Sequence, residues 1–339
     1  MDPVQALRQI AFELERRGEP TYRVRAFRRA AQVVGELGPG ELQRRIAAGT
    51  LEALPGIGAT TARVITEAAA GQQPAYLARL LGERPAPEPD GLRAALRGDC
   101  HTHSDWSDGG GPPDEMAEAA RALGHQWIAL TDHSPRLTVA NGLSAERLEA
   151  QLELVSELNA RLAPFRILTG IEVDILEDGS LDQDPDLLGE LDVVVASVHS
   201  KLRMPAGPMT ERMVTAIRNP HTDVLGHCTG RLLGGRGRRP ESVFDPGAVF
   251  AACREHGVAV EINCRPERMD PPDRLLGLAA EAGCLFAIDT DAHAPGQLDW
   301  LASGCARAEA AGIGPGRVIN SSSAGELLSR ARPASSSGQ

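Results

Sequence analysis

The chain has 339 residues, of which 42% are hydrophobic and 24% charged, and 46 acidic against 35 basic side chains give a net charge of −11. At about 150 residues per domain, this length predicts two domains. No apolar run reaches the roughly 18–20 residues that span a bilayer, and charges throughout the first 20 residues exclude a signal peptide, so we expect a cytoplasmic protein. Six cysteines without a CxxC pair fit a reducing compartment.

Residues 1–83 are expected to form the first domain, and their pattern is helical. Apolar side chains recur with the spacing of one helix face in VQALRQIAFELERRG and again in TYRVRAFRRAAQVVGEL. This region holds 11 arginines, nine acidic side chains and no lysine, a net charge of +2, whereas the rest of the chain carries −13. We therefore expect a small, mildly basic all-α domain before a strongly acidic one.

The string LPGIG, which contains Gly56, Ile57 and Gly58, precedes the apolar-periodic run ATTARVI. Two glycines allow a tight turn that exposes amide groups at the start of a helix, and such a helix start binds phosphate without base preference. The pattern resembles a helix-hairpin-helix motif, which implies contacts to a DNA backbone. Arg25 and Arg28 are further candidate DNA contacts. The alternatives are a simple turn between packed helices and a solvated helix face.

Residues 1–80 as a whole resemble the N-terminal domain of family X DNA polymerases, including the stretch TYRVRAFRRAA. That family often has a lysine directly after GIG, where this chain has Ala59. A Schiff-base lyase needs an amine nucleophile, and this region has no lysine. We therefore predict no such lyase activity, unless the α-amino group of the chain acts.

The string RPAPEPD at 84–90 has three prolines and no apolar periodicity, which predicts a linker over 84–92. From 93 to 331, short apolar runs alternate with helical stretches, the signature of a parallel sheet with crossover helices. The expected strands lie at 96–103, 126–133, 166–173, 192–199, 223–227, 258–263, 284–290 and 317–320. Seven or eight strands in about 240 residues favour a (β/α) barrel. Residues 332–339 are expected to be a disordered tail.

Histidines and carboxylates gather at the C-terminal ends of the expected strands and in the loop after the first, and active sites of (β/α) barrels lie at those ends. The set is His101, His103, Asp108, His133, Glu172, His199, His227, Asp291 and His293. Imidazole and carboxylate ligands together suit Zn, Mn or Fe, and nine ligands are too many for one ion. We therefore expect two or three divalent ions. The remaining His125, His221 and His256 are expected to be surface or cap residues.

The order HxH, TDH, E, H, H and DxH resembles the PHP (polymerase and histidinol phosphatase) family over roughly residues 96–330. The matching strings are HTHSDWSDG, LTDH, GIEVD, SVHS, GHCTGR and DTDAH. The resemblance implies an α/β fold, a distorted (β/α)7 barrel, here preceded by the small all-α helix-hairpin-helix domain. It also implies a trinuclear metal cluster with Glu172 as a bridging carboxylate.

Three further strings, TGRLLG, PMTERMVTAIRNP and EINCRPERMD, look closest to the PHP domain of bacterial family X polymerases. In those enzymes a polymerase palm separates the helix-hairpin-helix domain from the PHP domain. Only about a dozen linker residues separate the two here, which leaves no room for a palm, so we predict no nucleotidyl transfer.

Cations near the strand ends could hold a substrate phosphate. The candidates are Lys201, the only lysine of the chain, Arg231 and Arg268, with solvated surface positions as the alternative. Asp132 is expected to orient a neighbouring imidazole from behind. GGRGRR at 234–239 either borders a substrate channel or forms a solvated turn. Cys264 is expected to be a small buried residue rather than a metal ligand.

These residues together predict a metal-dependent hydrolase of phosphate esters, in which metal-activated water attacks phosphorus. The first hypothesis is a phosphodiesterase on DNA of the 3′–5′ exonuclease kind. The second is a phosphomonoesterase on a phosphorylated small molecule such as histidinol phosphate. The third, weakened by the intact ligand set, is a non-catalytic DNA-binding protein. The pattern leaves the oligomeric state open.

Overall fold

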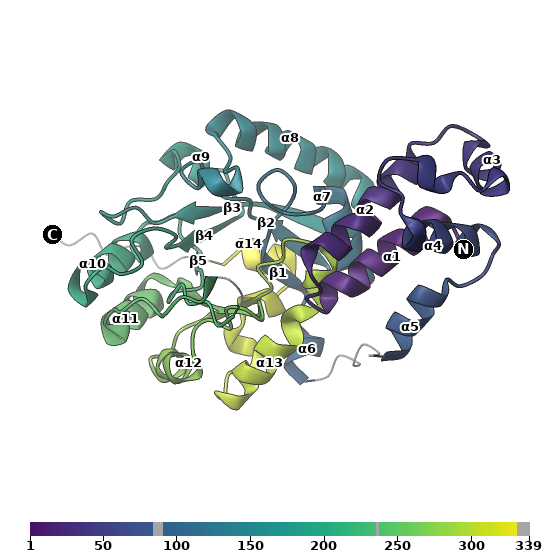
Figure 1. Cartoon of the computed structure of the whole chain (residues 1–339). Coiled ribbons are helices and arrows are strands. Elements are labelled where there is room, and N and C mark those ends of the chain that lie inside the picture. Colours follow the sequence, from purple (N-terminus) through teal and green to yellow (C-terminus); the bar gives the residue numbers. More distant parts are fainter. Residues whose placement is uncertain (84–90, 235–236, 331–339) are drawn as a thin grey trace. The chain divides into compact units, whose positions relative to one another are not determined.

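The computed structural model describes residues 1–83, 91–234 and 237–330, and the chain divides into two compact units at residues 88/89 (Figure 1). The expected tail at 332–339, most of the expected linker (84–90) and Gly235 and Arg236 of the GGRGRR string lie outside the described residues. Helix α6 (Gly91–Ala95) already begins inside the span expected as linker. Its Leu92 is buried, and the backbone N–H of Leu92 donates to Glu309 at 2.6 Å.

The first unit is helical, as its apolar spacing predicts. It contains α1 (Pro3–Arg16), α2 (Thr21–Gly35), α3 (Glu41–Ala48), the 3-10 turn η1 (Leu51–Ala53), α4 (Ala59–Ala69) and α5 (Ala75–Glu83). Asp2 caps α1 by accepting from the backbone N–H of Gln5 at 2.8 Å. Leu7, Ile10 and Leu14 of α1 are fully buried against the other helices, and each contributes about 1.5–3 kcal/mol of apolar burial.

The second unit is a parallel barrel of seven strands in the order β1 to β7. The strands are β1 (Gly98–Thr102), β2 (Trp127–Leu130), β3 (Arg166–Asp174), β4 (Val193–Ser197), β5 (Val224–Leu225), β6 (Ala259–Asn263) and β7 (Phe286–Asp289). A parallel bridge between Thr102 and Ala292 joins the first strand to the segment after the last. The predicted (β/α)7 barrel preceded by a helical domain is therefore confirmed.

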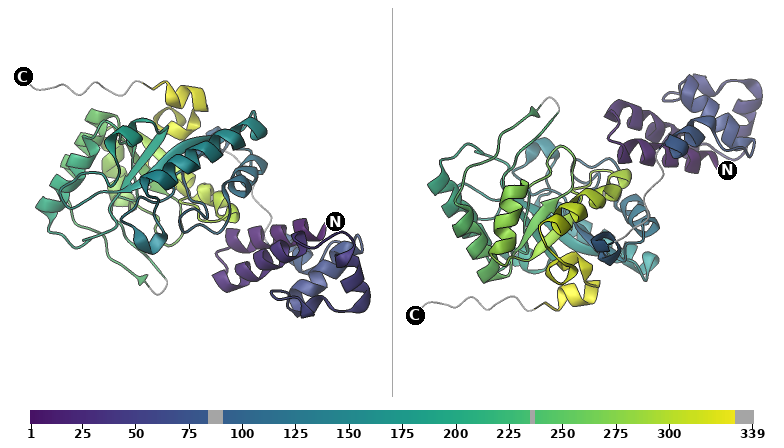
Figure 2. Two further views of the ribbon diagram at one scale, coloured as in Figure 1. Left: turned by 90° about the horizontal axis from the view of Figure 1, so that it is seen from above. Right: turned by 90° about the horizontal axis from the view of Figure 1, so that it is seen from below.

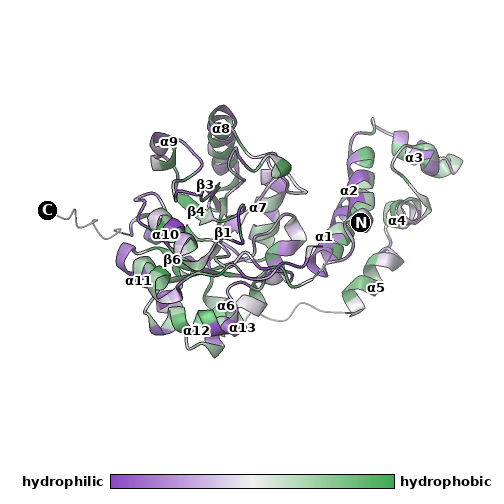
Figure 3. Cartoon of the chain, turned by 60° about the vertical axis from the view of Figure 1, so that its left-hand side comes forward, coloured by the Kyte–Doolittle hydropathy of each residue, from purple (hydrophilic) through white to green (hydrophobic). Residues whose placement is uncertain are grey.

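Helices surround the strands on the outside of the barrel, as two further views show (Figure 2). They are α7 (Pro113–Ala122), α8 (Ala145–Leu162), α9 (Pro185–Gly189), α10 (Ala206–Ile217), α11 (Pro246–His256), α12 (Asp273–Glu281), α13 (Leu301–Ala310) and α14 (Ala324–Leu328). Short 3-10 turns are η2 (Thr138–Ala140), η4 (Pro295–Trp300), η5 (Pro315–Arg317) and η6 (Ile319–Ser321). Many helices carry both hydrophilic and hydrophobic residues (Figure 3), as expected of elements with one face on a core.

The strand expected at 317–320 is absent, and this expectation is wrong. Residues 315–321 form the turns η5 and η6, with Val318 alone bridging to Phe286. The side chain of Asn320 takes the place of a strand: its amide donates to the carbonyls of Gly98 and Ile288 at 3.0 and 2.7 Å, and its carbonyl oxygen accepts from Ile288. One side chain thus satisfies backbone groups of both β1 and β7 that a further strand would otherwise pair.

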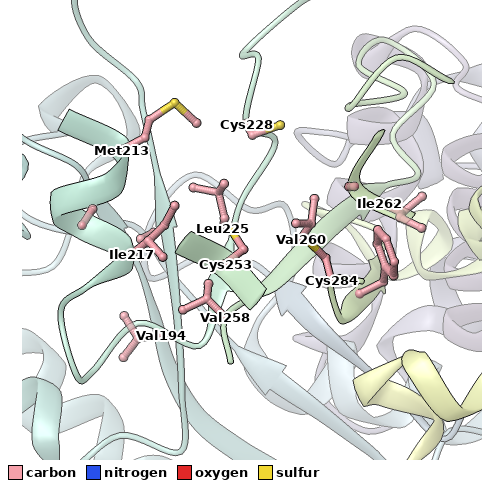
Figure 4. Close-up of a cluster of buried hydrophobic side chains, with 14 of the residues drawn as sticks. Val194, Met213, Ile217, Leu225, Cys228, Cys253, Val258, Val260, Ile262 and Cys284 are labelled. Atoms are coloured by element: carbon pink, nitrogen blue, oxygen red, sulfur yellow. The ribbon is translucent and has the colours of Figure 1, made fainter. Parts of the chain in front are cut away.

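Alternate residues of each strand pack on opposite sides of the barrel wall. Val194, Leu225 and Val260 pack with Met213 and Ile217 of α10 in the layer between strands and helices (Figure 4). A second cluster contains their strand neighbours, including Val195, Val224 and Ala259. By the same alternation, Glu261 and Asn263 lie on the same face of β6 as Ala259 and closer to the C-terminal end of the strand.

Two expectations from the sequence concern membrane-spanning helices and the state of the six cysteines. Among the described residues, no helix has both the length and the apolar character needed to cross a bilayer. All six cysteines are buried and unpaired, and burial raises the pKa of the thiols of Cys100, Cys228, Cys253 and Cys264 well above its usual value. Cys264 contacts the carbonyl of Ile262 rather than the histidine cluster, so it is a small buried residue.

Candidate metal centre

The barrel brings the nine expected ligands to the C-terminal ends of its strands. His101 lies on β1, Glu172 on β3, and the others follow β1, β2, β4, β5 and β7 by one to four residues, with Asp108 in the loop after β1. A register shift between Asp99 and Thr102 marks a bulge in β1, the kind of irregularity that re-aims side chains beside active sites.

Glu172 is the centre of the cluster and is 1% exposed. Its Oε2 lies 3.3 Å from His101 Nε2, 3.6 Å from His103 Nε2 and 2.9 Å from His133 Nδ1. Its Oε1 lies 3.2 Å from His199 Nε2 and 2.8 Å from His227 Nε2. One carboxylate therefore faces five imidazoles contributed by four different strands.

A second group surrounds the outer face of the same cluster. Asp108 Oδ1 lies 3.5 Å from His133 Nε2 and 3.3 Å from His293 Nε2. Asp291 Oδ1 lies 3.5 Å from His103 Nε2 and 3.4 Å from His293 Nδ1. His103 and His133 thus belong to both groups, which makes the cluster continuous.

The donor set fits divalent metal ions. Three groups have ligand atoms within 4.8 Å of one another, namely His103–Asp108–His133–His293, His101–His103–Glu172 and His133–Glu172–His199. Ligands about 2.1 Å from one tetrahedral ion lie roughly 3.4 Å apart, close to the separations found here. Both carboxylate oxygens of Glu172 and both ring nitrogens of His103 and His199 are buried without a hydrogen-bond partner among the described residues. Native proteins seldom leave so many buried polar atoms unsatisfied, and bound ions would satisfy them.

The charged side chains of the cluster shift one another's pKa values. Burial opposes ionisation of Glu172, but the facing His101, His199 and His133 outweigh it and hold the pKa of Glu172 well below its usual value. Burial likewise opposes ionisation of Asp291, whose pKa is nevertheless lowered well below the usual value, chiefly by Arg265. Both groups are therefore carboxylates that can accept a cation.

Asp132 does not contact an imidazole of the cluster, so the expected role is wrong. Its carboxylate accepts from the backbone and hydroxyl of Ser104 at 2.8 and 2.6 Å, from the hydroxyl of Ser107, and from the amide of Gln151 at 2.7 Å. Asp132 thereby holds the start of the loop that carries Asp108. The same loop is held from its other side, since Asn141 and Arg147 both donate to the carbonyl of Trp106.

The three expected phosphate-binding cations have different surroundings. Arg268 is in the site: its Nε lies 3.1 Å from Asp291 Oδ2, and its buried Nε and Nη1 have no hydrogen-bond partner among the described residues. Arg231 instead donates to the carbonyls of Arg268 and Met269, so it holds the backbone of Arg268. Lys201 is 64% exposed and lies 3.8 Å from Glu177, which makes it a surface ion-pair residue.

Sequence reasoning missed Arg265, whose Nη1 lies 3.4 Å from Asp291 Oδ1 and 3.1 Å from His293 Nδ1. It also missed Glu261, a carboxylate with 0% exposure. A charged residue inside the apolar run VAVEIN is a signal that could have found Glu261, because a strand interior retains a charge only where partners compensate it.

A cavity of about 370 Å³ opens onto the cluster. Its lining is Asp108, His133, Leu137, Val139, Ala140, His199, Leu232, Gly234, Gly237, Arg265, Glu267, Arg268, Asp291 and His293. Two described glycines of the GGRGRR string therefore border the cavity, as one of the two readings of that string predicts. The cavity combines candidate ligands and two arginines with an apolar portion from the 137–140 segment and Leu232.

In the first unit, Gly56 has φ +98°, and a Cβ there would lie 2.8 Å from Arg29 Cγ, so the turn requires glycine. Gly56 and Gly58 are exposed, Ile57 is buried, and α4 begins at Ala59. Arg25 is exposed. Arg28 makes a two-pronged ion pair with buried Glu15 at 2.6 and 2.9 Å, so its guanidinium supports the unit's core.

The three histidines outside the cluster were expected to be surface or cap residues. His125 is 4% exposed, and its backbone N–H donates to the carbonyl of Ala120 at 3.0 Å at the end of α7, so it is a buried cap residue. Burial, reinforced by the charge of Arg93, lowers the pKa of His125 to about 3. His221 and His256 are partly exposed.

Comparisons with known proteins identify the barrel and its histidine–carboxylate centre as those of a hydrolase of phosphate esters. A PHP domain profile matches residues 99–263, and a helix-hairpin-helix domain profile matches residues 1–73. The chain belongs to the PHP domain family, with an N-terminal helix-hairpin-helix domain.

Among known proteins, the chain is 42% identical over 228 residues to the DNA polymerase/3′-5′ exonuclease PolX of Bacillus subtilis (strain 168), which covers 67% of this chain and 40% of that protein. It thus spans less than half of that relative. It is 30% identical over 208 residues to a probable phosphatase of Thermoanaerobacter sp. (strain X514), covering 58% of this chain and 78% of that protein. The crystal structure of a histidinol phosphate phosphatase from Lactococcus lactis aligns with TM-score 0.48 and 18% identity, over 64% of this chain and 94% of that one.

Proposed function

We propose that the protein hydrolyses phosphodiester bonds of DNA, removing nucleotides from a 3′ end. The observation that carries the proposal is the union, in one chain, of a helix-hairpin-helix domain and a PHP domain, together with 42% identity over 228 residues to a relative named as a 3′-5′ exonuclease. A helix-hairpin-helix turn binds the sugar-phosphate backbone, which a metabolite phosphatase has no need to hold.

The ligand set would hold two or three ions of Zn, Mn or Fe, as its mixture of imidazoles and carboxylates suits. Such ions supply a water activated at neutral pH and neutralise charge on the phosphoryl oxygens. Glu172, with an imidazole on each of its oxygens, is the group best placed to bridge them.

Arg268 and Arg265 would orient the phosphate from the cavity side. Burial by itself would lower the pKa of Arg268, but the carboxylates of Asp291 and Glu172 outweigh burial and raise it, so the guanidinium stays charged. Its buried Nη1, which has no hydrogen-bond partner among the described residues, suits a phosphoryl oxygen, because guanidinium–phosphate hydrogen bonds are charge-assisted and directional. Arg231 keeps this side chain in place by holding the carbonyls of Arg268 and Met269.

In the first unit, the exposed backbone at Gly56 and Gly58, at the start of α4, would contact phosphates of the same DNA, and the exposed Arg25 of α2 is a further candidate contact. The net charge of +2 on residues 1–83, against −13 on the rest, favours this unit for the first encounter with DNA.

A second candidate function is hydrolysis of a small phosphomonoester. It is favoured by the 30% identity to a probable phosphatase that this chain matches over 78% of its length. A small phosphomonoester would, however, leave the helix-hairpin-helix domain without a ligand.

The test is a substrate panel with the full chain loaded with Mn or Zn. We expect hydrolysis of single- and double-stranded DNA and of bis-p-nitrophenyl phosphate, with slower turnover of p-nitrophenyl phosphate and histidinol phosphate. Turnover of monoesters alone would overturn the proposal in favour of the second candidate. Deletion of residues 1–83 should weaken DNA affinity and leave bis-p-nitrophenyl phosphate turnover unchanged. Unchanged DNA affinity would refute the role of the first unit.

A further inference from the structure

Strand β6 is the one strand of the described barrel that sends no member of the nine-residue set to the metal centre. It lies between β5 and β7, which carry His227 on one side and Asp291 with His293 on the other. In place of ligands, β6 presents Glu261 and Asn263, two residues apart and therefore on the same face of the strand. Both side chains are fully buried.

Glu261 contacts its partners through both carboxylate oxygens. Its Oε1 lies 2.6 Å from Nδ1 of His101. Its Oε2 accepts from the backbone N–H of His227 and, at 3.2 Å, from the amide of Asn263. A carboxylate only accepts hydrogen bonds, so Nδ1 of His101 must carry the proton. In the neutral imidazole that a metal ion would need, the lone pair then resides on Nε2, which faces Glu172 Oε2 at 3.3 Å.

Asn263 extends the same support to the last strand. Its amide donates to Oδ2 of Asp291 at 3.1 Å. Its carbonyl oxygen accepts from the backbone N–H of Arg265 at 3.1 Å, which fixes the amide orientation. The pair on β6 thereby touches three members of the ligand set, which come from β1, from the end of β5 and from the segment after β7.

We propose that Glu261 is a positioning residue of the metal centre: it sets the tautomer and ring orientation of His101, holds the main chain at His227, and is not itself a ligand. Both of its oxygens already face N–H donors, and Glu261 belongs to none of the three groups whose ligand atoms lie within 4.8 Å of one another. Partners of this kind behind a ligating histidine change metal affinity by about 10–100-fold when they are removed. The proposal concerns the metal centre and stands whether the substrate is DNA or a metabolite.

The test is metal affinity, measured by competition with a chromophoric chelator at constant pH. In Glu261→Gln the side chain keeps its size, but whichever way its amide turns, an N–H group faces either His101 Nδ1–H or His227 N–H. We expect the affinity of the tightest-bound ion to fall 10–100-fold with the number of bindable ions unchanged. The matched control is Asp192→Asn, which alters a carboxylate that accepts from the backbone of Thr169 at the opposite end of the barrel and should leave affinity within twofold.

Two further measurements separate positioning from general structural support. On a His101→Ala background, Glu261→Gln should lower affinity by less than threefold, because the effect passes mainly through that imidazole. Glu261→Asp keeps the charge but has a shorter side chain. Its metal affinity should lie between those of the wild type and Glu261→Gln, and this variant replaces Glu261→Gln if the glutamine variant does not fold. Additive losses in the double variant, unchanged affinity in Glu261→Gln, or loss of one whole ion at unchanged affinity for the rest would each overturn the proposal.

Discussion

Replacement of His125 by leucine should make the barrel less sensitive to acid. His125 lies in the turn before β2 and is 4% exposed. Neither ring nitrogen has a hydrogen-bond partner among the described residues, so an apolar side chain leaves no donor or acceptor stranded. Burial first, and then repulsion from Arg93, lowers the pKa of this imidazole from 6.5 to about 3.

The sign and size of the effect follow from proton linkage. Between pH 6.5 and about 3 the unfolded chain binds a proton at this position and the folded chain does not, so stability falls as pH falls. Each pH unit below 6.5 costs about 1.4 kcal/mol, which gives about 2 kcal/mol at pH 5. His125→Leu removes this term, so the stability of the variant relative to wild type should improve by about 2 kcal/mol between pH 8 and pH 5.

Urea unfolding at several pH values measures this difference. All three tryptophans, Trp106, Trp127 and Trp300, belong to the second unit, so their fluorescence reports the barrel alone. Both proteins are compared in chelator, where the cluster histidines contribute equally and cancel from the difference. The stability difference at pH 8 isolates the change in packing. Parallel pH curves for wild type and variant would show that His125 is protonated within the fold, contrary to the burial argument.

Four further outcomes are expected. Arg268→Met should raise KM for a phosphodiester by about 10–100-fold through loss of a charge-assisted contact, whereas the matched Lys201→Gln should stay within twofold in steady-state assays. Arg28→Met should destabilise the first unit by about 3–5 kcal/mol, since it removes the ion-pair partner of a buried carboxylate; faster hydrogen exchange across 1–83 would report it, and Arg25→Met should exchange like wild type. Asp132→Asn should speed exchange in 103–111, because the loop of Asp108 loses an anionic acceptor, and normal protection there would contradict the assigned contacts. Metal removal should lower the melting temperature of the barrel through loss of linked binding energy, and an unchanged melting curve in chelator would argue against a resident ion.

The sequence could predict which side chains gather at the strand ends, because most of the nine expected ligands stand at or just after the end of an apolar run. A strand that is buried on both faces is mostly apolar along its length, so the polar side chains of His133, His199 and His227 stand out where each hydrophobic string closes. Parallel topology then brings those ends together without any knowledge of the helices. The convergence on Glu172 follows from topology rather than from any local signal.

The direction in which a side chain points, and therefore which residues it contacts, could not be predicted in this way. Asp132 and Lys201 are both close in sequence to ligands, yet one points to Ser104 and Ser107 and the other to the surface. Closeness in sequence to a ligand does not predict where a side chain points once the strand has ended, because the conformation of the loop sets the backbone there. The missing eighth strand has a similar cause, since nothing local in RVIN shows that Asn320 will satisfy the edges of β1 and β7 with its side chain.

The inner side of the metal centre is held by a residue of a strand, and its outer side by contacts to a loop. His101 and His227 are held by Glu261, a strand residue at the barrel wall, and such an anchor is as rigid as the sheet. Asp108 is 38% exposed and depends on a loop tied down by Asp132 and Arg147. The cavity opens on the side of Asp108 and His293. The centre is therefore fixed most firmly where Glu172 gathers the imidazoles and is most adjustable where a phosphate would enter and a product would leave.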